Sequence, residues 1–254
     1  MSNSASNRPQ SVAPGFAQYA AEDFVQGAGV AIFHVKSERV VVCNAVDRRV
    51  GRYYFLPKGR RDAGEDTRTG AEREGFEEAR HVEYTLIMNL QSGYRNRLLP
   101  LPIQHCQPQA HPRISAPPMT AEPIWIQLMP LARHTKQYLL YWYIAETLPP
   151  DLEPLLESKP NEPYKPPPAF PSGLTLKERV AMEPEGYEPV HHEGTGVDEE
   201  ELGYVSELVG VEDAVRLLGE RSVMADVVRR GWEGIRERWR LEGKTEDDTS
   251  ARGG

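Results

Sequence analysis

Short hydrophobic runs separated by polar and turn-forming residues dominate this chain, and they predict a set of buried strands. Runs of roughly four to eight residues that are rich in β-branched and aromatic side chains and bounded by turn signals favour strands. The most hydrophobic run, 137–145, should lie at the centre of a sheet. We expect strands at 27–35, 39–43, 53–56, 82–90, 124–128, 137–145 and 203–208.

Three other stretches have the spacing of helices. Asp66 or Thr67 can cap the first helix, which should run to about His81. A second helix is expected at 212–218, and a longer one at 223–241, where apolar residues recur near helical spacing. Strands before, between and after helices indicate one α/β domain.

The remaining segments lack this patterning. We expect flexible tails at 1–26 and 241–254, on either side of a single domain at 27–240. Within that domain, 100–123 is rich in proline and should form an irregular connection. Prolines and then acidic residues fill 147–200, and a loop of this length and composition predicts an insertion that is largely disordered.

Composition narrows the function classes. The 254 residues carry a net charge of −8, which argues against a general nucleic-acid-binding surface. The two cysteines do not suggest a disulfide scaffold, although one disulfide remains open. The polar N-terminus lacks the apolar core of a secretory signal, and no run reaches the roughly 18 apolar residues of a membrane helix. We therefore expect no membrane partner and a location in the cytoplasm or nucleus.

Three glutamates in the first predicted helix suggest chemistry. Glu74, Glu77 and Glu78 stand at i, i+3 and i+4, so they are neighbours on one helix face and repel one another. A hard divalent cation such as Mg²⁺ relieves this repulsion, since it takes oxygen ligands from a few carboxylates and from substrate phosphates. The cluster predicts a metal site for phosphate chemistry, with a solvated helix face as the plainer alternative.

The surrounding residues resemble the Nudix hydrolase signature G-x5-E-x7-R-E-U-x-E-E-x-G-U, where U is a bulky apolar residue. Six of its fixed positions are present at the required spacing, namely Gly59, Glu65, Arg73, Glu74, Glu77 and Glu78. Residues 55–59, interpreted as a strand end and a turn, resemble the segment that usually precedes the motif. The resemblance covers roughly 27–146 and 203–240. The chain departs from the pattern at Gly75, Arg80 and His81, which affect helix packing and helix termination.

This resemblance implies a Nudix-type α/β/α sandwich with a mixed β-sheet and an enzyme that hydrolyses pyrophosphate bonds. The implied cofactor is Mg²⁺, with Mn²⁺ as a substitute, and the implied partner is a small-molecule diphosphate of the nucleoside diphosphate-X type. The sequence Leu-Pro-Lys-Gly at 56–59 resembles Nudix enzymes that act on dinucleoside polyphosphates or diphosphoinositol polyphosphates. The alternative is a weak or inactive Nudix module that binds a nucleotide or inositol phosphate for regulation.

The resemblance also implies roles for individual residues. Glu77 and Glu78 would be metal ligands, and Glu74 a ligand or the base that activates water. Arg73 would orient the carboxylates, and Glu65 would support the loop and contact the metal. A backbone carbonyl near Lys58 or Gly59 would complete the shell. The family often adds an acid from outside the motif, for which the candidates are Glu122, Glu146 and 198–201.

Several further residues have competing interpretations. Lys58, Arg60 and Arg61 are candidates for binding substrate phosphates, as is Arg68, with solubility and pairing to nearby acids as the alternative. Tyr94, Arg95 and Arg97 lie in another candidate phosphate-facing loop, and we favour the interpretation of a plain surface loop. His105-Cys106 and His191-His192 lack a second ligand pair at the spacing of a zinc site, and Tyr141 to Tyr143 should mostly pack in the core.

Overall fold

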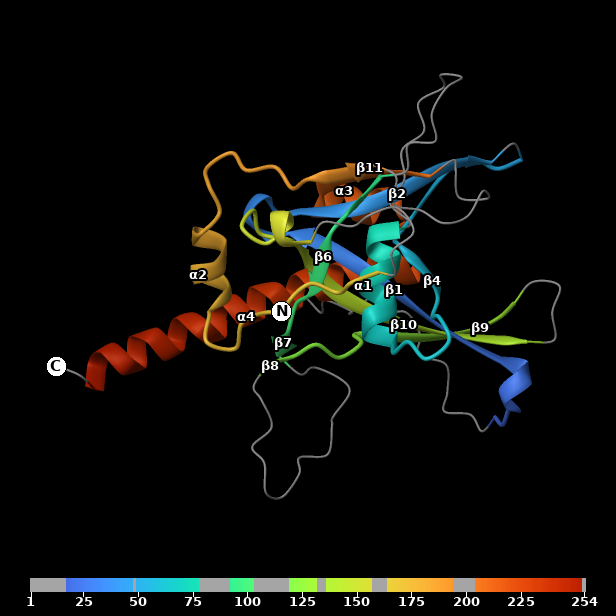
Figure 1. Cartoon of the computed structure of the whole chain (residues 1–254), viewed down its shortest axis with the longest axis horizontal. Helices are drawn as coiled ribbons and strands as arrows, with labels where there is room; N and C mark the ends of the chain where they lie inside the picture. Colours follow the sequence, from blue (N-terminus) through green and yellow to red (C-terminus); the bar gives the residue numbers. More distant parts are fainter. Residues whose placement is uncertain are drawn as a thin grey trace, which may run out of the picture.

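The computed structural model shows how these segments pack (Figure 1). It describes residues 17–47, 49–77, 92–102, 119–131, 136–156, 164–193 and 204–252. The predicted strand at 82–90 and the predicted end of the first helix at His81 lie outside these residues. Within them, no helix combines the length and the apolar character that crossing a bilayer requires.

One mixed sheet forms the middle of the molecule. Its main path runs in the order β12 (Val205–Gly210), β2 (Arg39–Asp47), β1 (Phe24–His34), β10 (Gln137–Thr147) and β6 (Asn96–Leu98). Three further strands pair with this path: β3 (Gly51–Phe55) with β2, β4 (Lys58–Arg60) with β1, and β9 (Trp125–Pro130) with β10. The central pair β1 and β10 is parallel, whereas the other pairings are antiparallel.

Small residues in β1 let large side chains of β10 lie across it. A Cβ on Gly29 would stand 2.5 Å from the ring of Trp142, which faces Gly29 in the strand register. A Cβ on Gly27 would stand 2.1 Å from the hydroxyl of Tyr138. Neither distance is sterically possible, so the two glycines are needed for these aromatic residues to take their places. The prediction of a central strand at 137–145 is confirmed.

Helices cover both faces of the sheet, as the alternation of β1 requires. On one face Ala28, Val30 and Ile32 pack with Ala71 of α1 (Thr67–Glu77). On the other face Ala31 and Phe33 pack with residues of α3 (Val211–Leu217) and of α4 (Val223–Arg252), which include Ala214, Val227, Val228 and Ile235. The predicted α/β/α sandwich with a mixed sheet is confirmed (Figure 1).

The segment 147–200 holds more structure than its composition suggested. It contains η3 (Glu153–Leu155), α2 (Leu176–Ala181) and β11 (His191–Glu193), and β11 pairs with β5 (Ser92–Tyr94). Thr175 and Glu178 close a capping box at the start of α2, which fixes the helix locally. The prediction of a largely disordered insertion is therefore wrong for 147–156 and 164–193. Residues 157–163 and 194–203 lie outside the described part.

A buried ionic network ties α2 to the sheet. Arg97 Nε donates to Glu146 Oε1 at 2.7 Å, while Arg179 pairs with both Glu146 and Glu183. Burial alone would lower the pKa of Arg179, but Glu146 and Glu183 raise it above its ordinary value. Arg97 is 2% exposed and Arg95 and Tyr94 are also buried, so the prediction of a surface loop for these residues is wrong.

Other boundaries differ from the prediction in smaller ways. The strand β4 replaces the turn expected at 57–59, because Lys58 to Arg60 pair with β1. The N-terminal tail is shorter, since η1 (Ala21–Asp23) leads directly into β1. The helix α4 continues past 241 to Arg252, where a flexible tail was expected. Within 100–123, β7 (Leu101–Pro102) pairs with β8 (Met119–Thr120). Between β1 and β2 the chain forms the short helix η2 (Val35–Ser37).

Candidate active site

One arginine gathers the carboxylates of the motif. Arg73 on α1 forms a fork with Glu65, in which Nε donates to Oε1 at 2.9 Å and Nη2 donates to Oε2 at 3.0 Å. Its Nη1 donates to Glu77 Oε2 at 2.7 Å and lies 2.9 Å from Glu74 Oε1. Nη2 also donates to the carbonyl of Arg60 at 2.8 Å, which joins the helix to β4. Four motif residues thus meet around a single guanidinium.

Burial makes this arrangement electrostatically strong. Arg73 is 8% exposed and Glu74 is 6% exposed, so solvent screens their interaction weakly. Burial alone would lower the pKa of Arg73, but the hydrogen bond to Glu65, the charge of Glu74 and the bond to Glu77 raise it well above its ordinary value. The guanidinium is therefore always charged, and it offsets part of the repulsion among the glutamates.

Gly59 gives Glu74 its place. A Cβ on Gly59 would stand 2.2 Å from Glu74 Oε2, so a larger residue there would expel the carboxylate from its position over β4. The carbonyl of Gly59 accepts a hydrogen bond from the Tyr138 hydroxyl at 2.8 Å. The motif glycine is thus explained by the close approach of helix and strand, and the motif did not indicate the contact with Tyr138.

Gly75 explains one departure from the family pattern. A Cβ at this position would stand 2.6 Å from Asn96 Nδ2 and 2.9 Å from Ile32 and Val30. The helix therefore lies closer to the sheet than a bulky apolar residue would permit. The departure changes how α1 packs and leaves Glu74 in contact with Gly59. Arg80 and His81, the other departures, lie outside the described residues.

The loop before α1 is held by its own acids. Glu65 Oε2 accepts from the backbone N–H of Asp62 at 2.9 Å, so the carboxylate that binds Arg73 also closes the loop. Asp66 Oδ1 accepts from the N–H groups of Arg68 and Thr69 at 2.8 and 2.9 Å, which caps the helix. Of the two predicted capping residues, Asp66 makes the capping contacts.

Three of the four candidate phosphate-binding cations, Lys58, Arg60 and Arg61, lie in or beside β4 in different environments. Arg61 Nη1 donates to the carbonyl of Glu65 at 2.5 Å, beside the carboxylate cluster. Arg60 holds Arg73 through its backbone carbonyl, and its side chain is exposed. A Cβ on Gly29 would stand 3.0 Å from the Cβ of Lys58, and the Lys58 Nζ lies 5.6 Å from the Phe55 ring centre. The substrate role of all three stays a prediction.

The acids considered for completing a metal shell also lie in different environments. Glu78 and 198–201 lie outside the described residues. Glu146 is fully buried and bound by Arg97 and Arg179, which makes it a structural residue. Glu122 accepts from Arg68 at 2.7 Å. Among the residues that the structure describes, no group of three or more His, Cys, Asp or Glu side chains is arranged to hold a metal ion.

Sequence reasoning missed Glu72, which has an unusual protonation equilibrium. Burial raises its pKa to about 7 against a hydrogen bond from the Leu98 N–H, and repulsion from Asp66 adds to the rise. The Leu98 N–H lies 2.8 Å from Glu72 Oε1, and Asn96 Nδ2 donates to the Glu72 carbonyl at 2.9 Å. Glu72 joins α1 to β6 and lies outside the Arg73 cluster. Nothing in its sequence context distinguished it from a solvated glutamate.

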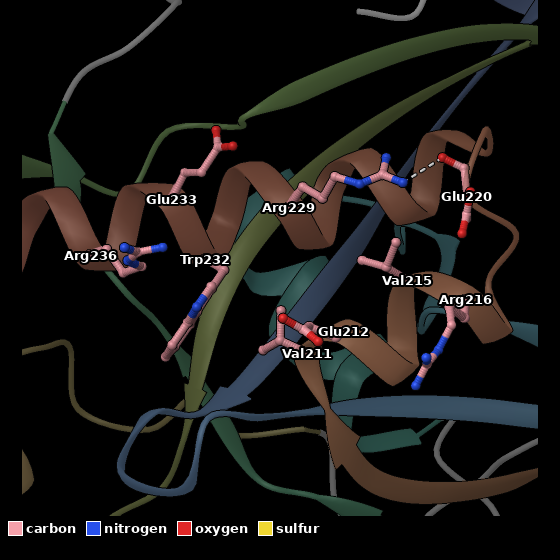
Figure 2. Close-up of a pocket in the computed structure, with 9 residues that line it drawn as sticks. All are labelled: Val211, Glu212, Val215, Arg216, Glu220, Arg229, Trp232, Glu233 and Arg236. Carbon is pink, nitrogen blue, oxygen red and sulfur yellow. Dashed lines mark hydrogen bonds between the residues drawn. The ribbon is translucent and has the colours of Figure 1, made fainter. Parts of the chain in front are cut away.

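A separate hollow of about 370 Å³ lies between α3 and α4, on the opposite side of the sheet from α1 (Figure 2). Its lining mixes arginines and glutamates in equal number around Trp232 and two valines. Arg229 is turned toward the end of the hollow, where its Nη2 donates to the carbonyl of Glu220 at 2.6 Å. The balanced charges give no excess that would attract a phosphate.

Comparisons with known proteins gave structural likenesses only. No protein-family model and no curated protein matches the sequence. A Nudix hydrolase from Nitrosomonas europaea is similar in structure over 82% of this chain and 88% of its own, with 10% identity and a TM-score of 0.40. An Ap4A hydrolase from C. elegans is similar over 81% and 93%, with 14% identity and a TM-score of 0.35.

A MutT Nudix hydrolase from Burkholderia pseudomallei is similar over 49% of this chain and 67% of its own, with 16% identity and a TM-score of 0.28. All three TM-scores are below 0.5, so we take the functional assignment from the motif and from the contacts of Arg73.

Proposed function

We propose that this chain is a Nudix-type hydrolase that uses a divalent metal ion to cleave a pyrophosphate bond of a small molecule with water. The observation that carries the proposal is the meeting of Glu65, Glu74 and Glu77 around Arg73, beside Gly59. These residues are separated in sequence by the motif spacing, and the fold brings them together. A chance charge run on a solvated helix would not bury Arg73 and Glu74 in this way.

The donor groups at this place suit Mg²⁺. Glu74 contributes a carboxylate directly over Gly59, whose carbonyl is a second oxygen donor, and Glu77 adds a third on the same helix. By the motif, Glu78 would add the fourth. An all-oxygen set with several carboxylates is typical of Mg²⁺ and Mn²⁺ sites. When bound, such an ion lowers the pKa of water and neutralises charge on the phosphoryl oxygens.

The protein's own contribution is to hold the acids in place. Arg73 fixes one oxygen each of Glu74 and Glu77 and leaves an excess of negative charge, because three glutamates share one guanidinium. Glu74 is either a ligand or the base that takes a proton from the attacking water. Arg61, next to the cluster, is the best placed of the three cations to meet a phosphate.

The substrate class rests on the sequence alone. Residues 56–59 and the cations near them favour a dinucleoside polyphosphate or a diphosphoinositol polyphosphate. Mg²⁺ as the ion in use, with Mn²⁺ as a substitute, is likewise part of the proposal.

A second candidate function is a Nudix module that binds a nucleotide or an inositol phosphate without hydrolysing it. The observation that favours it is the direct pairing of Arg73 with Glu74 and Glu77, which occupies part of their binding capacity. The departures at Gly75, Arg80 and His81 point the same way, since they weaken the match to the motif of the active family members.

A phosphate-release screen separates the two. The protein is incubated with a panel of diphosphate compounds and either Mg²⁺ or Mn²⁺, beside the variants Glu77→Gln and Glu78→Gln. The matched control is Glu72→Gln, which removes a carboxylate from the same helix outside the cluster. Hydrolysis by the wild type and the control, lost in both other variants, supports the enzyme. Tight binding of a panel member without release of phosphate supports the module.

A further inference from the structure

Phe76 is buried at a position that the Nudix pattern leaves unspecified. It lies between Gly75 and Glu77 on α1 and is 9% exposed. It follows Gly75, which faces the sheet, so its side chain points about 100° around the helix from that contact. Side chains of other elements cover the ring there, next to Glu77.

Three side chains surround the ring. The guanidinium carbon of Arg95 lies 5.4 Å from its centre, which is the geometry of a cation–π contact. The ring of His192 meets it edge-on at 5.7 Å, and the ring of Tyr164 is 6.1 Å away. Tyr164 and His192 both belong to the segment 147–200, while Arg95 joins β5 to β6. We call these three residues the Phe76 cage.

The cage is itself fixed in place. Glu153, which is 8% exposed, accepts from His192 Nε2 at 2.8 Å through Oε2, and its carbonyl accepts from Arg95 Nη1 at 3.0 Å. The pairing of β11 with β5 sets His192 opposite Gly93. Groups from η3, β11 and the β5–β6 connection therefore contact one another independently of Phe76, and these contacts fix the positions of the cage residues.

The cage also adjoins the carboxylates of α1. Burial raises the pKa of the Tyr164 hydroxyl well above its ordinary value, and the charges of Glu72 and Glu77 add to the rise. A neutral phenol in contact with Phe76 thus lies within electrostatic reach of Glu77. The segment 147–200 reaches the helix that carries the motif, although the motif itself contains none of its residues.

We propose that Phe76 is a positioning residue for the hydrolysis, and that the Phe76 cage fixes the turn of α1 that carries Glu77. The inference rests on the proposed function. Gly75 has no side chain with which to anchor this turn, and a glycine within a helix is less stabilising than an alanine. Phe76 supplies the missing anchor about 100° around the helix from Gly75. A displacement of about 1 Å at a reacting centre can reduce the rate about 100-fold, so anchoring the turn matters for the chemistry.

The chain offers a matched control in Phe170. It is also 9% exposed and lies under guanidinium groups, with Arg97 at 5.0 Å and Arg238 at 4.1 Å from its ring centre. It packs in the core cluster of the α4 face, away from α1. Phe76→Ala and Phe170→Ala therefore remove the same group from similar surroundings, and they differ in their distance from the carboxylates.

The experiment compares kcat, KM, Mn²⁺ affinity by electron paramagnetic resonance and thermal stability in both variants. We expect Phe76→Ala to lower kcat by about 10- to 100-fold with KM nearly unchanged, and to weaken Mn²⁺ binding by about 10-fold or more. Phe170→Ala should lose similar thermal stability and retain kcat and Mn²⁺ affinity. Phe76→Leu, which keeps an apolar anchor and protects folding, should recover most of kcat.

Two outcomes overturn the inference. One is a Phe76→Ala variant with wild-type kcat and Mn²⁺ affinity, and the other is an equal loss of kcat in both alanine variants at equal stability. If the wild type binds Mn²⁺ but hydrolyses none of the panel, the proposed hydrolase fails while the Mn²⁺ affinities still decide the role of Phe76 in placing Glu77. A wild type that neither hydrolyses nor binds Mn²⁺ overturns both.

Discussion

Two arginines in this molecule, Arg73 and Arg179, each form ion pairs with more than one glutamate, but the balance of charge differs between the two clusters. Arg73 binds Glu65, Glu74 and Glu77, so negative charge is in excess around it. Around Glu146 and Glu183, which are fully buried, Arg179 and Arg97 supply one positive charge for each negative one. The Arg73 cluster keeps partial solvent access at Glu77, whose side chain is 17% exposed.

The difference gives a criterion for function. A balanced and sealed cluster has no capacity for a further ion, so it can only join elements, here α2 to the sheet. In a cluster with surplus carboxylates and a solvent-accessible side, the carboxylates repel one another, and a bound cation would relieve this repulsion. On this criterion we propose the Arg73 cluster as the functional one and the Arg179 network as structural. Four predictions test that division.

The largest effect is expected from Arg179→Met. Removing one partner of a buried ion pair leaves uncompensated charge and typically costs about 3–5 kcal/mol. We expect a loss of that size in the free energy of unfolding, measured by urea denaturation, with kcat per folded molecule unchanged. A loss below about 1 kcal/mol would show that the network does not support the fold.

Glu72 sharpens the comparison, because it is half-buried on α1 and pairs with no arginine among the residues that the structure describes. Its pKa of about 7 in the folded state exceeds the ordinary value of 4.5. Between these two pH values the folded protein therefore binds more protons than the unfolded protein does. This contribution to stability is complete below about pH 4.5 and is lost as the pH rises through 7. At about 1.4 kcal/mol per pKa unit, the loss should approach about 3 kcal/mol.

The variant Glu72→Gln stays neutral at every pH and should lack this dependence. We therefore expect the stability of the wild type relative to the variant to fall between pH 4.5 and pH 8, as measured by urea denaturation at each pH. Parallel pH profiles for the two proteins would contradict the raised pKa.

Arg73→Lys tests the functional cluster. A lysine keeps the positive charge but cannot reproduce the fork to Glu65 together with the contacts to Glu74 and Glu77. We expect kcat to fall by about 10- to 100-fold, with a smaller loss of stability than in Arg179→Met. Wild-type kinetics in this variant would remove Arg73 from the positioning of the acids.

Gly59→Ala should have the smallest effect on folding, because α1 can shift to relieve the clash of the new Cβ with Glu74. Overpacking of this kind costs about 1–3 kcal/mol. We expect kcat per folded molecule to fall as well, since the Glu74 carboxylate moves from its position beside Gly59. Gly173→Ala is the control, because a Cβ there meets nothing within 4 Å. Equal activity in the two variants would refute the close contact of Gly59 with Glu74.

The sequence predicted the parts of the fold that depend on apolar patterning. The central strand followed from hydrophobic runs and the position of the motif from fixed spacing, while the two covering layers followed from the resemblance to Nudix hydrolases. The segment 164–193 was missed because its few apolar core residues, Phe170, Leu176 and Val180, are scattered among prolines and charged residues. The ion pairs of Arg179 with Glu146 and Glu183 also hold it, and ion pairs leave no hydrophobic pattern. The only local signal for α2 is the capping box of Thr175 and Glu178.

The candidate site, like the fold, was predicted only in part from the sequence. Spacing located Arg73 and the acids, but it could not show that a single guanidinium binds three of them. The contact of Tyr138 with Gly59 depends on strand order, and the cage around Phe76 depends on a segment far away in the chain. Neither leaves a local pattern.

The most direct test of the division between the two arginine clusters is a Mn²⁺ titration followed by electron paramagnetic resonance. Wild type, Glu77→Gln and Glu72→Gln are compared at one pH and salt concentration. We predict that the wild type and Glu72→Gln bind Mn²⁺ with similar affinity, and that Glu77→Gln binds it at least about 10-fold more weakly. Equal affinity in all three proteins would contradict the assignment of the Arg73 cluster as the metal site.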